Sequence, residues 1–308
     1  MNDRKELVEA LAKELEGGKL PWDKGFRGIR DSNAVSGKPY SGGNIIRLLA
    51  SAQKNGFEDP RWCTFKQAQE QGWNVKKGSK GTRIEFWSKV EDKDERDQDS
   101  PNKSEKADKP ERMFCRLFYV FNGSQIEGIP PLPAIVVPEP GELTKLAERA
   151  AKGMGVEIEN RRAGDLDSPF YAPKADKIVM PLREQFTQAG VYEAVLLHEL
   201  GHATGHQSRL DRESLKLYGT SIETRAREEL VAELASVFAR HDFGVPVDPR
   251  GHSTAYLQSW ASVIREDPNA LFVAARQADQ AVGMIKEHGR EVGIEIPKER
   301  TIDRGRGR

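Results

Sequence analysis

The sequence predicts an α+β protein of two domains, on three observations. Its 308 residues exceed the roughly 100 to 200 residues usual for one domain. Its first part mixes helical and strand patterns, whereas its last part is a succession of helical patterns. Between the two parts, residues 128–142 (GIPPLPAIVVPEPGE) concentrate five prolines and two glycines, which break regular structure. We therefore expect one domain over residues 1–130, a linker over 131–140 and a second domain over 141–308.

Composition limits where the protein acts. Charged residues make up 31% of the chain and hydrophobic residues 37%, and no apolar run approaches the roughly 20 residues of a membrane helix. The first residues lack the apolar core and the cleavage site of a signal peptide. The only cysteines, Cys63 and Cys115, are too few and too far apart to suggest a disulfide scaffold or a cysteine metal site. We expect a cytoplasmic protein with no membrane partner.

Charge is distributed unevenly, although Lys and Arg balance Asp and Glu over the whole chain. Residues 1–90 carry 17 basic residues against 11 acidic ones, a surplus of 17 − 11 = +6. Residues 91–112 carry 6 against 9, and residues 113–308 carry 25 against 28, so each of these parts has a charge of −3. A positive first part indicates an anionic partner for the N-terminal domain, unless it reflects ordinary variation of surface charge.

Short helices and strands alternate in the N-terminal part. An amphipathic pattern predicts a helix that ends at the glycine pair 17–18, and a second helix begins at about Asn44. Thr64 is a suitable N-cap for a third, short helix. Polar and apolar residues alternate over 82–89, after a glycine-containing turn, which predicts a hairpin with residues 74–77.

A charged segment interrupts the strand pattern. Residues 91–112 hold 15 charges in 22 positions and no aromatic or large aliphatic side chain, so they have nothing with which to form a core. A strong strand pattern resumes over 113–121. We interpret the segment at about 91–112 as a disordered loop between two strands of the first domain.

The second part begins with helical and strand patterns and ends in helices. The patterns predict a helix over 143–153, strands over 156–159 and 177–180, and, after the motif helix described next, helices over about 222–242, 254–264 and 268–288.

The segment VYEAVLLHELGHATGH carries the main chemical motif. His198 and His202 stand four residues apart, which on a helix puts both imidazoles on one face, close enough to share a metal ion. Glu199 lies beside them, where a carboxylate can act as general base on a water molecule activated by zinc. Four apolar residues precede His198, and Gly201 is a small residue suited to close packing.

A catalytic zinc ion needs a third protein ligand and an open position. His206 continues the row, but it lies about 12 Å along a helix from His198 at about 1.5 Å per residue, so both bind one ion only if the helix ends at Gly205. Asp211 is a second candidate, in a predicted turn. Glu229, 229 − 202 = 27 residues after His202, is the favoured ligand because it lies on a predicted helix.

Neighbours of Glu229 are assigned supporting roles. Glu233, one turn later, is expected to accept the second nitrogen proton of a ligand histidine and to fix its orientation, the alternative being a solvated helix charge. Glu228 is the alternative metal ligand, and Tyr218 is a candidate donor for the transition state. The predicted cofactor is one zinc ion held by His198, His202 and Glu229, and a zinc ion that is only structural is the alternative.

A nucleic-acid face is predicted in the first domain. Residues 61–89 carry seven basic residues against two acidic ones, with five aromatic residues among them. Cations that follow phosphates and rings that stack on unpaired bases hold single strands. No base-reading motif is present, so sequence-independent binding is expected. We expect Trp62 and Phe86 in the core, and on the DNA-binding face Tyr40, Trp73, Lys76, Lys77 and Lys80.

These motifs together resemble a known family. HELGH followed by EELVAE is similar to the gluzincin side of the zincin metallopeptidases. From about residue 5 to 290 the chain resembles the ArdC-type anti-restriction proteins of conjugative plasmids, in the pieces KPYSGGN (38–44), WCTFKQ (62–67), VKKGSKGT (75–82) and VFN (120–122). The resemblance implies a mixed domain that binds single-stranded DNA, followed by a zincin-like metallopeptidase domain, which together protect incoming plasmid DNA from host restriction.

Three functions follow as hypotheses. The first is an anti-restriction protein that binds single-stranded DNA and carries a zinc-dependent peptidase domain. Its protein substrate is unknown, and the host restriction system is one candidate source of it. The second is a DNA-coating shield whose zinc domain is structural. The third is a protease acting on proteins crosslinked to DNA, whose cleavage would depend on single-stranded DNA.

Overall fold

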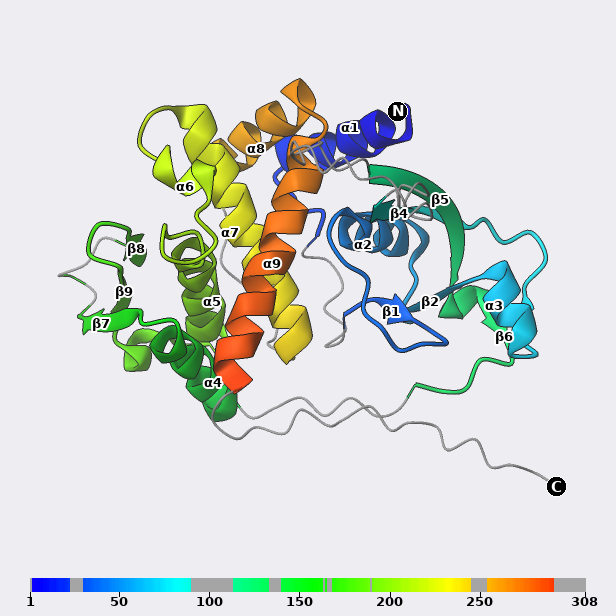
Figure 1. Ribbon diagram of the computed structural model, residues 1–308, viewed down its shortest axis with the longest axis horizontal. Coiled ribbons are helices and arrows are strands. Elements are labelled where there is room, and N and C mark those ends of the chain that lie inside the picture. The colour runs from blue at the N-terminus through cyan, green and yellow to red at the C-terminus, as the bar shows by residue number, and fades with distance from the viewer. Residues whose placement is uncertain are drawn as a thin grey trace, which may run out of the picture.

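The structure, a computed structural model, describes residues 2–22, 30–89, 113–132, 140–162, 164, 168–188, 190–244 and 254–290 (Figure 1). It has the mixed helix and sheet content of an α+β protein, as the sequence predicts. The charged segment 91–112, most of the expected linker and the residues beyond 290 lie outside the described residues. No helix in the described ranges is long and apolar enough to cross a membrane.

The first part of the chain contains small sheets and short helices. Its elements are α1 (Asn2–Glu16), β1 (Ser32–Asn33), α2 (Gly43–Asn55), β2 (Arg61–Thr64), α3 (Phe65–Glu70), β3 (Asn74–Val75), β4 (Thr82–Lys89), β5 (Met113–Asn122) and β6 (Ile126–Glu127). Thr64 caps α3 as predicted, because its hydroxyl accepts from the Gln67 amide while the Gln67 side chain accepts from the Thr64 amide.

Strand pairing differs from the predicted hairpin. β3 does not pair with β4; it pairs antiparallel with β6, and β4 pairs antiparallel with β5 over its whole length. The main sheet has the order β1-β2-β5-β4, so β4 is an edge strand. The prediction failed because an alternating pattern indicates a strand and does not indicate which strand pairs with it. Here β4 pairs with β5, which lies beyond the charged segment.

The second part contains a small sheet and a group of long helices. Its elements are α4 (Pro140–Gly153), β7 (Glu157–Arg161), β8 (Phe170–Ala172), β9 (Lys177–Pro181), α5 (Val191–Ala203), α6 (Glu213–Lys216), α7 (Ile222–Phe243), α8 (Thr254–Glu266) and α9 (Ala270–Arg290). The sheet order is β7-β9-β8, with β7 parallel and β8 antiparallel to β9. Of these elements, β8 and α6 were not predicted from the sequence.

Helix α7 is central to the second part (Figure 1). It contacts α5, α8 and α9, and its residues from Glu228 to Arg240 are all buried. A helix buried on every side gives little amphipathic signal, and its position is fixed by the neighbours packed around it. One large cluster of buried apolar side chains includes residues of α5, α7, α8 and α9. This packing holds α5 against α7, which carry the functional residues described below.

The N-terminal helix α1 packs against α8, although the two are far apart in the sequence. Arg265 of α8 pairs with Glu9 and Glu16 of α1, and the rings of Trp22 and Trp260 lie 6.3 Å apart between centroids. The first residues therefore contribute to the core beside the helices of the second part.

Helix α2 meets α9 through charged and aromatic contacts. The guanidinium of the buried Arg47 lies 5.1 Å from the ring centroid of Phe272 and also pairs with Glu85 of β4. The carboxylate of Asp279 accepts a hydrogen bond of 3.0 Å from the Gly42 amide. The sheet of the first part is thus connected to the helices that surround α7.

Candidate functional site

Helices α5 and α7 approach each other closely at Gly201. A Cβ atom at this position would lie 3.2 Å from the Cα and carbonyl oxygen of Ala232, so any larger residue would push the helices apart. The sequence prediction that a small residue serves close packing is correct here. The approach brings the ligand faces of the two helices together.

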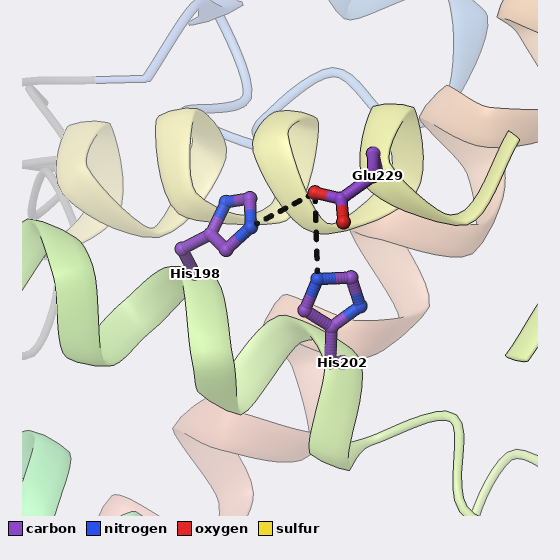
Figure 2. A group of neighbouring side chains, drawn as sticks. All are labelled: His198, His202 and Glu229. Carbon is purple, nitrogen blue, oxygen red and sulfur yellow. Dashed lines mark ion pairs between the residues drawn. The ribbon is translucent and has the colours of Figure 1, made fainter. Parts of the chain in front are cut away.

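Three side chains from these helices converge on one point (Figure 2). Glu229 Oε2 lies 3.5 Å from His198 Nε2 and 3.7 Å from His202 Nε2. One ligand atom from each residue lies within 4.8 Å of the others. Two imidazole nitrogens and one carboxylate oxygen form a ligand set that suits a divalent metal ion such as zinc, with room left for a further ligand.

Each histidine has a carboxylate behind it. His198 Nδ1 lies 3.6 Å from Glu233 Oε2, and His202 Nδ1 lies 3.1 Å from Glu228 Oε1. Such partners set which ring nitrogen carries the proton and leave the other free to bind a metal. Glu233 therefore lies beside His198 at a distance longer than a hydrogen bond, and Glu228 lies behind His202, outside the metal group.

Arg212 stabilises this arrangement, and no nearby residue in the sequence predicts that role. Its side chain is buried, and Nη2 donates to Glu228 Oε1 at 2.6 Å and to the Gly201 carbonyl at 2.6 Å. Nη1 donates to Thr204 Oγ1 at 2.7 Å. Because carbonyls at the end of a helix lack partners within the helix, Arg212 both completes the end of α5 and neutralises Glu228.

The other two candidate ligands lie away from the metal group. Helix α5 ends at Ala203, and His206 Nδ1 lies 2.8 Å from Ser208 Oγ. Asp211 pairs with Lys216 on the surface. Among the described residues, the group that could hold a metal ion contains neither of them.

A cavity of about 800 Å³ opens beside the three converging residues. Its lining includes Glu199, which is on the same helix as the histidines, and Tyr218, whose hydroxyl donates to Glu229 Oε1. Arg225 also lines it and donates to the Tyr256 hydroxyl at 3.0 Å. The rest of the wall is mostly apolar, as is usual for a ligand pocket.

In the metal-free protein, the buried carboxylates favour the protonated, positively charged form of both histidines. Burial disfavours an imidazolium, but Glu229 and Glu233 outweigh it and raise the pKa of His198 to about 9. Burial is likewise outweighed by Glu228 and Glu229, which raise the pKa of His202 to about 10. Burial would raise the pKa of Glu229, yet the two imidazoles hold it well below its usual range.

These pKa shifts predict that metal binding releases protons. In the unfolded chain a histidine has a pKa of about 6.5, whereas in the folded protein the two values are about 9 and about 10. The ion pairs therefore stabilise the metal-free protein fully below about pH 6.5. This stabilisation is lost as the pH rises through about 9 to about 10. A metal ion needs both imidazoles neutral, so its affinity should rise with pH up to that range. Titration calorimetry at neutral pH, in buffers of different ionisation enthalpy, should report release of one to two protons; a heat independent of the buffer would contradict this.

The predicted DNA-binding residues lie in two settings. Lys76, Lys77 and Lys80 are exposed, beside β3 and the start of β4. Trp73 is half-buried against a small apolar cluster. Tyr40 packs its ring against a second cluster and donates to the Trp62 carbonyl at 3.3 Å. The expectation of an exposed Tyr40 ring is therefore wrong, and burial, partly opposed by Asn33, raises its pKa to about 12.

The two expected core aromatics behave differently. Trp62 is fully buried, and its indole nitrogen donates to Asp31 at 2.7 Å. Phe86 is 55% exposed, so its expected place in the core is wrong. Helix α2 covers the start of β4, where Ile84 is buried, and the strand extends beyond that cover. Alternation in the sequence indicates which residues share a face; it does not say how far along the strand that face is covered.

Comparison with protein families identifies both parts of the chain. Residues 1–121 match the N-terminal domain of anti-restriction factor ArdC, and residues 145–277 match a zincin-like metallopeptidase family. The second match contains all the residues of the group described above.

Whole-chain comparisons find relatives that match most of the chain. The chain is 33% identical to the uncharacterized protein y4eC of Sinorhizobium fredii, over 89% of this chain and 87% of that one. Two proteins of Escherichia coli called DNA primase TraC are each 37% identical over 89% of this chain, which spans only 26% and 19% of their lengths.

Solved structures of the antirestriction protein ArdC from plasmid R388 have the same fold. The metal-free structure superposes with a TM-score of 0.74 at 27% identity, covering 94% of this chain and 98% of that one. The Mn(II)-bound structure gives 0.73 at 26% identity, covering 94% and 99%.

Proposed function

Because the chain belongs to the ArdC-type family of anti-restriction proteins, we propose that it acts in the cytoplasm on transferred DNA, binding single strands and cleaving a protein as a zinc-dependent peptidase. The observation that carries the peptidase part is the convergence of His198, His202 and Glu229 beside Glu199, in the wall of a cavity. The protein cleaved would be one that threatens the incoming DNA, such as a component of a host restriction system.

Zinc is the metal we propose for the site. Two imidazoles and a carboxylate are a ligand set typical of catalytic zinc, and the carboxylates behind both histidines fit that use. The R388 protein, which has the same fold, has been solved with Mn(II) bound, and this supports a divalent ion in this chain. A zinc ion would supply a Lewis acid that polarises the peptide carbonyl and lowers the pKa of water.

The protein side chains would perform the remaining steps. Glu199 would take the proton of the attacking water and pass it to the leaving amine, since it lines the cavity next to both histidines. Glu233 and Glu228 would hold the two imidazoles in the tautomer that leaves Nε2 free. Tyr218 lines the same cavity, and its hydroxyl, which donates to Glu229 in this structure, would turn to donate to the developing oxyanion.

DNA binding is proposed for the first part of the chain. Its surplus of positive charge over residues 1–90, 17 basic against 11 acidic, supports an anionic partner. The exposed Lys76, Lys77 and Lys80 support contact with phosphates. No base-reading motif is present, so we propose binding that does not depend on sequence.

Plasmid transfer into a restricting recipient tests the proposal. Cells that express the wild-type chain should protect the incoming plasmid, and the Glu199→Ala variant should lose protection while the purified variant keeps its fold and its DNA affinity. Full protection by Glu199→Ala would contradict the peptidase and favour a DNA-coating shield, for which removal of the charges of Lys76, Lys77 and Lys80 should abolish protection. Cleavage of a DNA-crosslinked protein that requires added single strands would favour the third hypothesis.

A further inference from the structure

The β4–β5 ribbon exposes a row of aromatic side chains on one face. Residues directly opposite each other in an antiparallel pair point to the same side. Phe86 is opposite Arg116, Ile84 is opposite Phe118, and Ser88 is opposite Phe114. Phe86, Phe114, Arg116 and Phe118 therefore share one face, and we call these four residues the ribbon stripe.

The ribbon stripe begins where the apolar core ends. Ile84 and Val120, on the same face, are buried with Leu48 of α2. Beyond them, Phe118 is 39% exposed, Phe114 50% and Phe86 55%. Large exposed apolar patches with a polar surround mark binding surfaces. The exposed rings of the stripe lie on β4 and β5, the strand pair at one edge of the sheet; Figure 1 shows where these two strands lie.

The side chains of the stripe contact one another in two pairs, and the rings of the first pair meet edge to face. The rings of Phe86 and Phe118 lie 6.3 Å apart between centroids, and the guanidinium of Arg116 lies 5.5 Å from the centroid of the Phe114 ring. Alternate residues of one strand are about 6.8 Å apart, at about 3.4 Å per residue. This spacing is about twice the roughly 3.4 Å between successive nucleotides of a DNA strand, so flat bases could stack between or upon these groups.

The charge around the stripe favours a polyanion over an apolar protein partner. Residues 74–88 and 114–122 carry five basic residues and a single acidic one, Glu85. Glu85 is already paired with Arg4 and with Arg47, so it offers little repulsion to an anion. Lys77 and Lys80 are exposed just before β4. Positive charge that tracks a backbone beside rings that stack on bases is the arrangement that binds single strands.

We propose that the ribbon stripe is the base-stacking platform for single-stranded DNA, with Lys77 and Lys80 contacting phosphates farther along the strand, beyond the covered start of β4. This inference rests on the proposed function and moves the aromatic part of the DNA site away from Tyr40 and Trp73, whose rings are packed against apolar clusters. It also gives Arg116 a role, because a guanidinium plane can stack on a base while its charge faces the phosphates.

Fluorescence anisotropy tests the inference by measuring how the full chain binds a labelled oligothymidylate. The oligonucleotide should be longer than roughly 16 nucleotides, the upper length that one binding fold covers. Phe86→Leu and Phe114→Leu should each raise the Kd about 5- to 100-fold, since base stacking is lost although an apolar side chain remains. Phe86→Tyr and Phe114→Tyr should bind within about twofold of the wild type, because a ring that stacks is kept. Phe65→Leu, at an exposed ring of α3, is the matched control and should not change the Kd.

Each other outcome has a distinct meaning. Wild-type affinity in both leucine variants, with loss of binding after removal of the charges of Lys76, Lys77 and Lys80, would overturn the platform and leave the proposed DNA binding intact. No binding by the wild type would remove the proposed DNA binding as well. If the wild type is a dimer by light scattering and Phe86→Ala is a monomer, the stripe is an interface between two copies and not a DNA site.

Discussion

Replacing Glu229 with alanine should weaken zinc binding by more than about 100-fold, because the loss of a partner behind a ligand already costs about 10- to 100-fold. Glu229 is the only carboxylate within the described metal group, and its Oε2 lies 3.5 Å from His198 Nε2 and 3.7 Å from His202 Nε2. Without it, two imidazoles alone would have to hold the ion. Competition with a chromophoric chelator near neutral pH measures the affinity.

A matched control lies on the same helix. Glu223 is exposed in the first turn of α7 and pairs with Arg227, so Glu223→Ala should leave zinc affinity unchanged. Wild-type affinity in Glu229→Ala, together with loss of binding in Glu228→Ala, would show that the neighbouring carboxylate is the ligand. Circular dichroism of both variants separates a lost ligand from a lost fold.

The metal group could be predicted because its geometry is local. Two histidines four residues apart share a helix face whatever surrounds them, and a downstream helix with paired glutamates offers a third ligand. Which of two adjacent glutamates faces the ion depends on the rotation of α7 against α5, which is set where Gly201 meets Ala232. The sequence favours Glu229 over Glu228 without fixing that rotation.

Features that depend on distant contacts were missed. Arg212 lies in a loop, and nothing near it in the sequence says that its side chain reaches the end of α5 and Glu228. For the same reason, Phe86 was wrongly expected in the core, and Tyr40 is half-buried where an exposed ring was expected. A ring next to glycines looks exposed and a ring in an alternating strand looks buried, but the cover provided by α2 decides both.

The second large effect, on the stability of the fold, is expected when Arg212 is replaced. Arg212→Leu leaves the fully buried Glu228 without its guanidinium and removes the donor to the Gly201 carbonyl, so it should lower the free energy of unfolding by about 3 to 5 kcal/mol. Urea unfolding in the presence of a chelator measures this without a contribution from bound metal. Lys216→Leu, which removes an exposed ion pair, should cost at most about 1 kcal/mol.

A double variant separates the stability of this ion pair from its role at the metal. Arg212→Leu combined with Glu228→Leu leaves no unpaired buried charge, so it should recover much of the stability lost in the single variant. Zinc affinity should nevertheless stay about 10- to 100-fold below that of the wild type, because His202 Nδ1 no longer has a carboxylate to orient it. Recovery of both stability and affinity would contradict this role for Glu228. If only stability recovers, the pair is kept at this position because it holds His202 toward the metal.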